Sequence, residues 1–451
     1  MSTGQTVKET FPPGLSNAFL FAIFNALSFQ IVLGSPIVLY AQTLGASATV
    51  LGIISALMPL LVIFQIPAAQ YIGRIGYKRF VLSGWAARVV CIFGLALVPL
   101  TSAFLDGQAR LALVLALLFG FNLLRGISSC AWLPWITMLV PAQLRGRYLA
   151  RDAAVTNLAS FGAFVVGALC LYGDPRPWQF SLLFLFSAVA GAISLIFLNR
   201  MPDVCPPAEV HAVGGRVPWR EMAGHKPFTR QLLQLVVWSV AYGGITPFTV
   251  AFLKSWSGLS EAKIMMVAAV AFLGGLSSQW FLGAQLDKLG SKPVLGFACA
   301  AWTAVSAGWL VLAGGAFPSR LGFVLMLQFL MGLLAALVNM ANTRLAMAII
   351  PAAGRDHYFA VYSVVGNLAL GVAPIGWGLM IDAVGARQFH WLGLNWNKYA
   401  LYYAAAAVVF TIALLCTRRL VEPEAAGLEA LLRDILIESP YRFWLRFWPR
   451  S

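Results

Sequence analysis

The chain has 451 residues, of which 60% are hydrophobic and only 10% are charged. Soluble globular domains carry about 25% charged residues, so this composition cannot supply a water-facing surface. The net charge of +15 would suit a nucleic-acid partner. No basic run alternates with aromatic residues in a polar segment, however, which argues against nucleic acid. We therefore predict that the chain lies in a lipid bilayer.

Twelve apolar runs follow one another along the chain, each with about the 20 residues that cross a bilayer. The first six lie at 18–42, 49–69, 80–101, 110–140, 149–172 and 178–199. The second six lie at 229–254, 262–284, 293–315, 320–350, 357–381 and 397–417. The first run is too long for a signal peptide and is predicted to be retained. The expected fold is an all-α polytopic membrane protein with twelve transmembrane helices in two six-helix bundles.

A polar stretch between the sixth and seventh runs divides the chain. We predict an N-terminal six-helix bundle at 1–199, a cytoplasmic linker at 200–228 and a C-terminal six-helix bundle at 229–420. Residues 421–451 interleave aromatic residues with arginine, which is typical of an amphipathic helix in the headgroup plane. This cytoplasmic tail is predicted to anchor to the membrane, and a docking site for a partner is the alternative.

The positions of the basic residues predict the orientation. With both termini in the cytoplasm, 21 of the 31 Lys and Arg residues fall on the cytoplasmic side. This bias is what the positive-inside rule requires. We expect a multi-pass protein of the cell (inner) membrane, monomeric, with the lipid bilayer and a small-molecule substrate as its partners.

An internal repeat relates the two halves. The segment from Pro141 to Ala159 aligns without gaps to the segment from Pro351 to Ala369, with nine identities in nineteen positions. Both segments lie between the fourth and fifth runs of their half, so the halves are parallel repeats. Parallel six-span halves are typical of alternating-access transporters.

The loops between the second and third runs of each half resemble a motif of the major facilitator superfamily, roughly G-x-x-x-D-x-x-G-x-[RK]-[RK]. The second copy matches from Gly283 to Lys292, and the first copy keeps its last glycine and basic pair but has Gly73 at the acidic position. The resemblance implies a gating role for Asp287, Gly290, Lys292, Gly76, Lys78 and Arg79. The alternative is that these charges only set the topology.

The fourth run carries an arginine about halfway through the bilayer. Asn122, Arg125 and Trp132 share one helix face, and a polar face on a spanning helix must contact protein or a water-filled cavity. We predict that Arg125 contacts substrate or a gate, the alternative being a structural tie between helices. Arg88 and Arg344 lie nearer the ends of their runs and are predicted to be structural or to snorkel.

Glycine–proline breaks interrupt the first and seventh runs, at Gly34–Pro36 and Gly243–Pro247. Interrupted helices at matching places in two repeats favour a binding site near the midplane; an aromatic packing face with a proline kink is the alternative. The predicted substrate-binding residues are Asn25, Asn122, Arg125, Trp132, Trp238, Tyr242, Asn339 and Asn342.

All sixteen Asp and Glu residues lie in loops or near the ends of runs. Their absence from the midplane argues against obligatory proton coupling, because coupling usually needs an ionisable carrier there. An arginine without a counter-charge favours an anion. The sequence predicts a secondary transporter of a small organic anion or amphiphile, without cofactor, metal or enzymatic activity. The alternatives are a membrane assembly factor on the same scaffold and a proton-coupled exporter.

Overall fold

The computed structural model describes residues 12, 14–141, 144–204, 219–318, 320–351 and 355–422. The side chains at 145–147, 150, 280–289 and 355–356 lie outside the described part. Twelve helical segments of the described chain are long and apolar enough to cross a membrane, which confirms the predicted fold class. The predicted tail beyond residue 422 and the linker from 205 to 218 lie outside the described residues.

Five of the first six spans agree with the predicted runs to within a few residues; the fourth run, predicted at 110–140, ends as a span at Ser129. The first span is α1 (Ser16–Leu33) with α2 (Ser35–Thr43), and the second is α3 (Ala48–Leu61) with η1 (Val62–Phe64) and α4 (Gln65–Ala69). The others are α6 (Tyr77–Leu97) with η2 (Val98–Ala103), α7 (Gly107–Ser129), α9 (Arg145–Cys170) and α10 (Pro177–Asn199). Two short helices, α5 (Ile72–Ile75) and α8 (Trp132–Leu139), lie between spans.

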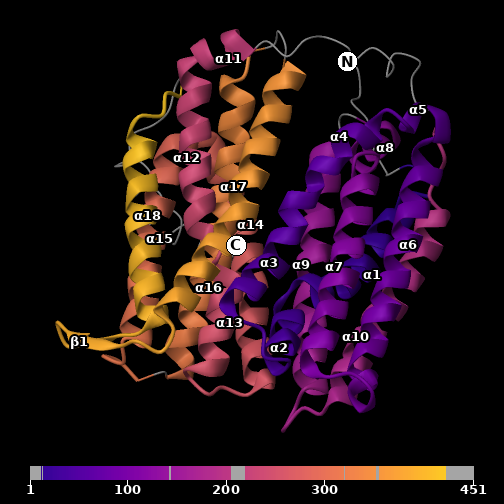
Figure 1. The fold of residues 1–451 in the computed structure, drawn as a ribbon. Coiled ribbons are helices and arrows are strands. Elements are labelled where there is room, and N and C mark those ends of the chain that lie inside the picture. The colour runs from indigo at the N-terminus through magenta and orange to yellow at the C-terminus, as the bar shows by residue number, and fades with distance from the viewer. Residues whose placement is uncertain are drawn as a thin grey trace, which may run out of the picture. The chain divides into compact units, whose positions relative to one another are not determined.

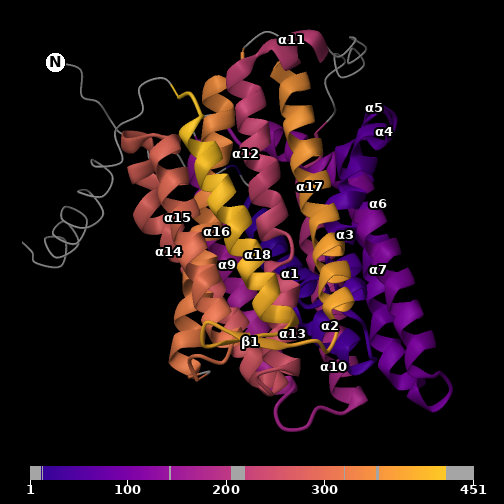
Figure 2. The ribbon, with the colours of Figure 1, turned by 60° about the vertical axis from the view of Figure 1, so that its left-hand side comes forward.

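The last six spans repeat this pattern. The seventh is α12 (Lys226–Tyr242) with α13 (Ile245–Ser255), preceded by the short helix α11 (Trp219–Gly224). The remaining spans lie in α14 (Glu261–Leu289), α15 (Ser291–Ala313), α16 (Leu321–Ile349), α17 (Arg355–Val384) and α18 (Lys398–Arg418). Figures 1 and 2 show α12, α15, α17 and α18 running alongside one another, and α1, α6, α7 and α10 doing the same.

The chain divides into two compact units. Unit 1 contains Met1–Ala46, Leu57–Gly215 and Gly258–Ala269, and unit 2 contains Ser47–Ala56, Arg216–Ser257 and Val270–Ser451. The division therefore runs through the middle of α3 and of α14, each of which contributes one part to each unit. The predicted domain limits at 199 and 229 remain predictions.

Matching residues of the two repeats adopt matching conformations. Gly76 precedes α6 with φ 85° and ψ 153°, and Gly290 precedes α15 with φ 85° and ψ 164°. Only glycine enters this region readily. Asn157 and Asn367 each donate a side-chain hydrogen bond to the carbonyl four residues earlier, at 3.0 and 2.9 Å. The sequence repeat therefore corresponds to a structural repeat.

The predicted helix breaks occur where glycine permits close packing. The first span breaks at Gly34, where an added Cβ would lie 2.7 Å from the Phe164 ring. The seventh breaks at Gly243 and Gly244, and a Cβ on Gly244 would lie 2.9 Å from the Tyr402 hydroxyl. A break leaves carbonyls without helical partners, and the Trp377 indole donates to one of them, Val240 O, at 2.7 Å.

A β-hairpin between α17 and α18 is the one two-stranded sheet in the described part of the chain. Strands β1 (Phe389–Trp391) and β2 (Leu394–Trp396) are antiparallel. The sequence predicted only a loop here. Three-residue strands fall below the length at which alternation of polar and apolar residues can be recognised.

Candidate functional site

An arginine side chain is buried between helices of unit 1. Arg88 of α6 is 4% exposed and donates from Nη2 to Asn25 Oδ1 of α1 at 2.8 Å. Its guanidinium lies 4.4 Å from the centre of the Trp85 ring and 5.1 Å from that of Phe121. The Trp85 indole also donates to Asn25 Oδ1, at 3.2 Å. Arg88 therefore does not snorkel to the membrane surface, which its place in the sequence had allowed.

A second arginine, Arg125, lies in the same unit on α7, which packs against α6. Arg125 Nη1 and Arg88 Nε are buried without a hydrogen-bond partner. Neither arginine pairs with a carboxylate among the described residues. A buried guanidinium without counter-charge is unfavourable, so these two side chains are the best candidates in unit 1 for binding an anion.

Polar and aromatic side chains complete this cluster. Asn122, one turn before Arg125, is buried and donates to Leu118 O of its own helix at 2.9 Å, while its Oδ1 has no partner. Trp132 is half-buried, and its ring centre lies 4.9 Å from that of Phe21 and 6.2 Å from that of Trp85. We call Asn25, Arg88, Asn122, Arg125 and Trp132, with Trp85, the arginine cluster.

Aromatic residues of α12 form a second cluster, in unit 2. Trp238 and Tyr242 stack with ring centres 4.7 Å apart, and Tyr242 meets Trp302 of α15 edge-on at 5.6 Å. The Trp238 indole is buried without a hydrogen-bond partner. This arrangement is compatible with a binding site, and equally with the alternative that these aromatic residues of α12 only pack against neighbouring helices.

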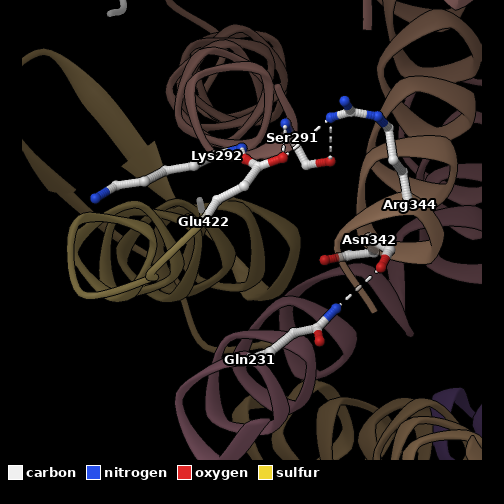
Figure 3. A network of polar contacts seen from close by, with 6 residues as sticks. All are labelled: Gln231, Ser291, Lys292, Asn342, Arg344 and Glu422. Carbon is white, nitrogen blue, oxygen red and sulfur yellow. Dashed lines mark hydrogen bonds and ion pairs between the residues drawn. The ribbon is translucent and has the colours of Figure 1, made fainter. Parts of the chain in front are cut away.

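The two predicted asparagines of α16 differ in exposure, although they are one turn apart on the helix. Asn342 is buried, and its backbone carbonyl accepts a hydrogen bond from Gln231 Nε2 at 2.9 Å (Figure 3). Asn339, three residues earlier, is exposed. Unit 2 thus contains Trp238, Tyr242, Asn339 and Asn342, while unit 1 contains the other predicted binding residues.

Glu422, just after α18, holds three chain segments of unit 2 together. Its side chain is 4% exposed and forms a 3.0 Å ion pair with Arg344 of α16. Its two oxygens accept from the backbone N–H groups of Ser291 and Lys292, at 2.9 and 2.7 Å. A carboxylate stabilises a helix N-terminus, here that of α15. We call this arrangement the Glu422 clasp; Figure 3 shows the carboxylate between the two partners.

Two of the predicted gating residues lie beside this region. Gly290 and Lys292 adjoin the Glu422 clasp, and the Lys292 ammonium points away from the carboxylate in Figure 3. The backbone of Asp287 lies in α14, but its side chain is outside the described part. In unit 1, Gly76 occupies the position of Gly290, while Lys78 is half-buried and Arg79 exposed.

Two carboxylates with defined roles were not identified from the sequence. Glu422 was not paired with Arg344, because 78 residues separate them and no local spacing connects them. Asp382, near the end of α17, accepts from the N–H groups of Ala48 and Thr49 at the start of α3, at 3.0 and 2.8 Å. Long-range capping of this kind has no signal in a single sequence.

The chain matches a family model described as Major Facilitator Superfamily over residues 18–260 and 243–448. Among solved structures it resembles a mutant of the nucleoside transporter NupG (TM-score 0.69, 13% identity, 91% of this chain and 100% of that chain). It also resembles a D-xylose–proton symporter (TM-score 0.70, 13% identity, 91% and 98%). A bacterial homologue of the human lysosomal transporter Spinster gives a TM-score of 0.61 at 14% identity (91% and 98%).

No curated protein sequence matches the chain. The structural neighbours establish the fold, and the family model covers almost the whole length. Together with the twelve candidate spans and the repeated halves, these findings identify the chain as a member of the major facilitator superfamily.

Proposed function

We propose that the protein is a secondary transporter that moves a small organic anion, or an amphiphile with an acidic group, by alternating access. The observation that carries this proposal is a pair of arginines in one unit, the buried Arg88 and the half-buried Arg125. Arg88 Nε and Arg125 Nη1 are buried without a hydrogen-bond partner, and neither residue pairs with a carboxylate among the described residues. A ligand carboxylate, sulfonate or phosphate would supply the missing charge and accept from the free guanidinium N–H groups.

The surroundings of the arginines support an organic ligand. Trp85, Trp132 and Phe21 lie within 6.2 Å of one another by ring centres. Aromatic faces contribute apolar contact without requiring a charged partner. An acidic compound with a flat or hydrophobic part therefore suits this cluster better than a small inorganic anion.

The carboxylates support uniport or exchange over obligatory proton coupling. Within the candidate spans of the described chain, Asp152, Glu261 and Asp382 each lie within three residues of a span end. Proton carriers are usually placed inside the membrane. The arginine cluster thus offers a site for substrate charge without offering a proton carrier.

A thermal-shift experiment on the purified protein tests this proposal. Organic anions, sugars and neutral amphiphiles are added to the native protein and to the Arg125→Ala variant. A ligand that binds only the native state raises the apparent stability by RT ln(1 + [L]/Kd). We expect organic anions to raise the melting temperature of the native protein and to leave the variant unchanged.

Arg220→Ala is the matched control, because Arg220 is exposed on α11, outside the candidate spans. It should respond to anions as the native protein does. Stabilisation by neutral compounds alone, or an equal response of Arg125→Ala, would contradict the anion proposal. A stoichiometric protein or pigment that co-purifies would instead favour the assembly-factor alternative.

A further inference from the structure

The β-hairpin between α17 and α18 has an unusual turn. Leu392 and Gly393 join the two strands with φ angles of 51° and 72°. Two-residue turns with both φ angles positive favour Asn-Gly or Asp-Gly, because those residues tolerate the left-handed region. Leu392 is the only non-glycine residue of the described chain with a positive φ.

The same turn exposes large apolar side chains. Leu392 is 74% exposed, Trp391 is 60% exposed and Phe389 is 51% exposed. A turn that faces water gains nothing from leucine in a strained backbone position, where asparagine or glycine would be both better solvated and less strained. Leucine is favourable at this position if the tip enters an apolar phase.

The hairpin is firmly attached to unit 2. Asn395 N donates to Gly314 O at the end of α15 at 2.8 Å, and the Asn397 side chain donates to Ala313 O at 2.6 Å. Within the hairpin, the Trp396 indole donates to Trp391 O at 3.0 Å. Figure 1 shows β1 projecting sideways beyond the lower end of α18, and Figure 2 shows the hairpin crossing that end. The tip thus points away from the helices to which it is attached.

Two basic residues flank the hairpin. Arg387 lies two residues before β1 and is exposed, and Lys398 lies two residues after β2 at the start of α18. Apolar and aromatic residues between cations match the layers of a bilayer surface, where acyl chains lie beneath the phosphates. A protein partner would not require this layering.

We propose that the hairpin is a lipid anchor. Trp391 and Leu392 enter the boundary between headgroups and acyl chains, and Arg387 and Lys398 contact lipid phosphates. The anchor fixes the ends of α15 and α18 at a constant depth in the bilayer, because both ends are bonded to the hairpin. The proposal does not depend on what the arginine cluster binds.

Fluorescence in lipid nanodiscs tests the anchor. An environment-sensitive fluorescent amino acid replaces Leu392 in the full chain, and in a second protein it replaces Trp391. The matched control carries it at Asp174, an exposed residue in the loop between α9 and α10. The nanodiscs contain phosphatidylcholine and phosphatidylglycerol, with and without lipids that carry a nitroxide near the headgroup end of the acyl chain.

At positions 392 and 391 we expect a blue-shifted emission maximum and loss of intensity when the nitroxide lipid is present. At position 174 neither change is expected. Emission at 392 and 391 equal to that at 174, without quenching, would overturn the proposal. A blue shift without quenching would overturn it as well, because the tip would then be covered by protein.

Discussion

Both units of the molecule contain arginine side chains among packed helices, but the arginine of unit 2 is paired with a carboxylate and those of unit 1 are not. In unit 2, Arg344 meets Glu422, whose carboxylate also binds two backbone N–H groups. In unit 1, Arg88 meets an amide and aromatic rings, and neither Arg88 nor Arg125 pairs with a carboxylate among the described residues. A paired charge holds helices together, whereas an unpaired charge remains available for a ligand. The comparison suggests that repeated halves can divide structural and binding roles between them.

Removing the carboxylate of the Glu422 clasp should have the largest effect on stability. Glu422→Ala leaves Arg344 without its partner and the start of α15 without its cap. Breaking a fully buried ion pair costs about 4 kcal/mol; Arg344 is 32% exposed, so its share is smaller, but two backbone hydrogen bonds are lost as well, and we expect a clear drop in melting temperature. Glu221→Ala, at an exposed residue of α11, is the control and should change little. Equal melting temperatures for both variants would show that the clasp is not a structural tie.

Removing the unpaired arginine should act on binding instead. Arg125→Ala should lose the ligand-induced stabilisation, about 2.7 kcal/mol at a ligand concentration of 100 Kd. Without ligand the variant should be as stable as the native protein or more so, since a half-buried charge without counter-charge is removed. Isothermal titration of both proteins with the stabilising anion checks the first point, and thermal unfolding without ligand checks the second. A strongly destabilised Arg125→Ala variant would show that Arg125, like Arg344, has a structural role.

The amide that binds Arg88 should matter for stability more than a neighbouring amide. Asn25→Ala removes the acceptor shared by Arg88 and Trp85, and hydrogen bonds to charged groups contribute about 2 kcal/mol. Asn122→Ala is the matched comparison, because its side chain donates only within its own helix. Thermal unfolding of the ligand-free proteins should rank Asn25→Ala clearly below Asn122→Ala. The reverse order would show that Arg88 is held by its aromatic contacts alone.

Substituting alanine for the glycines before α6 and α15 should lower the stability by similar amounts, whereas the arginines of the two units are expected to differ. Gly76→Ala and Gly290→Ala place a Cβ in a backbone region that costs about 1.5 kcal/mol. Gly162→Ala, inside α9 with open space around the added Cβ, should be neutral or slightly stabilising. Melting temperatures of the three variants measure the difference. If only one of the two variants, Gly76→Ala or Gly290→Ala, loses stability, the two matching glycines do not contribute equally to the stability of the protein.

Much of the fold could be predicted, because every span needs about 20 predominantly apolar residues to cross a bilayer. All twelve runs correspond to spans, eleven of them to within a few residues, and the breaks at Gly34 and Gly243 followed from local glycine and proline chemistry. The α8 helix was merged with the fourth run, since apolar residues continue through Cys130 and Ala131. The 389–396 hairpin was missed because its strands are too short for a periodic signal.

The site was predictable only in part, because its contacts join residues far apart in sequence. The depth of Arg125 in its own helix predicts a functional role, which stays a prediction. That Arg88 lies near Arg125, and that Asn25 accepts from Arg88, depends on three helices packing together. The Glu422 clasp likewise joins α15, α16 and the chain after α18. Residue spacing along one helix carries no information on such partners.

The division of the chain through the middle of α3 has a consequence for dissecting the protein. Ser47–Ala56 belongs to unit 2, although it precedes most of unit 1 along the chain, and Asp382 caps its first residues. A cut between residues 205 and 218 would therefore not yield two self-sufficient fragments. Each fragment would lack a stretch of its own unit and would carry the stretch that the other fragment needs. Co-expressed fragments should thus complement each other, whereas either one made alone should remain incomplete.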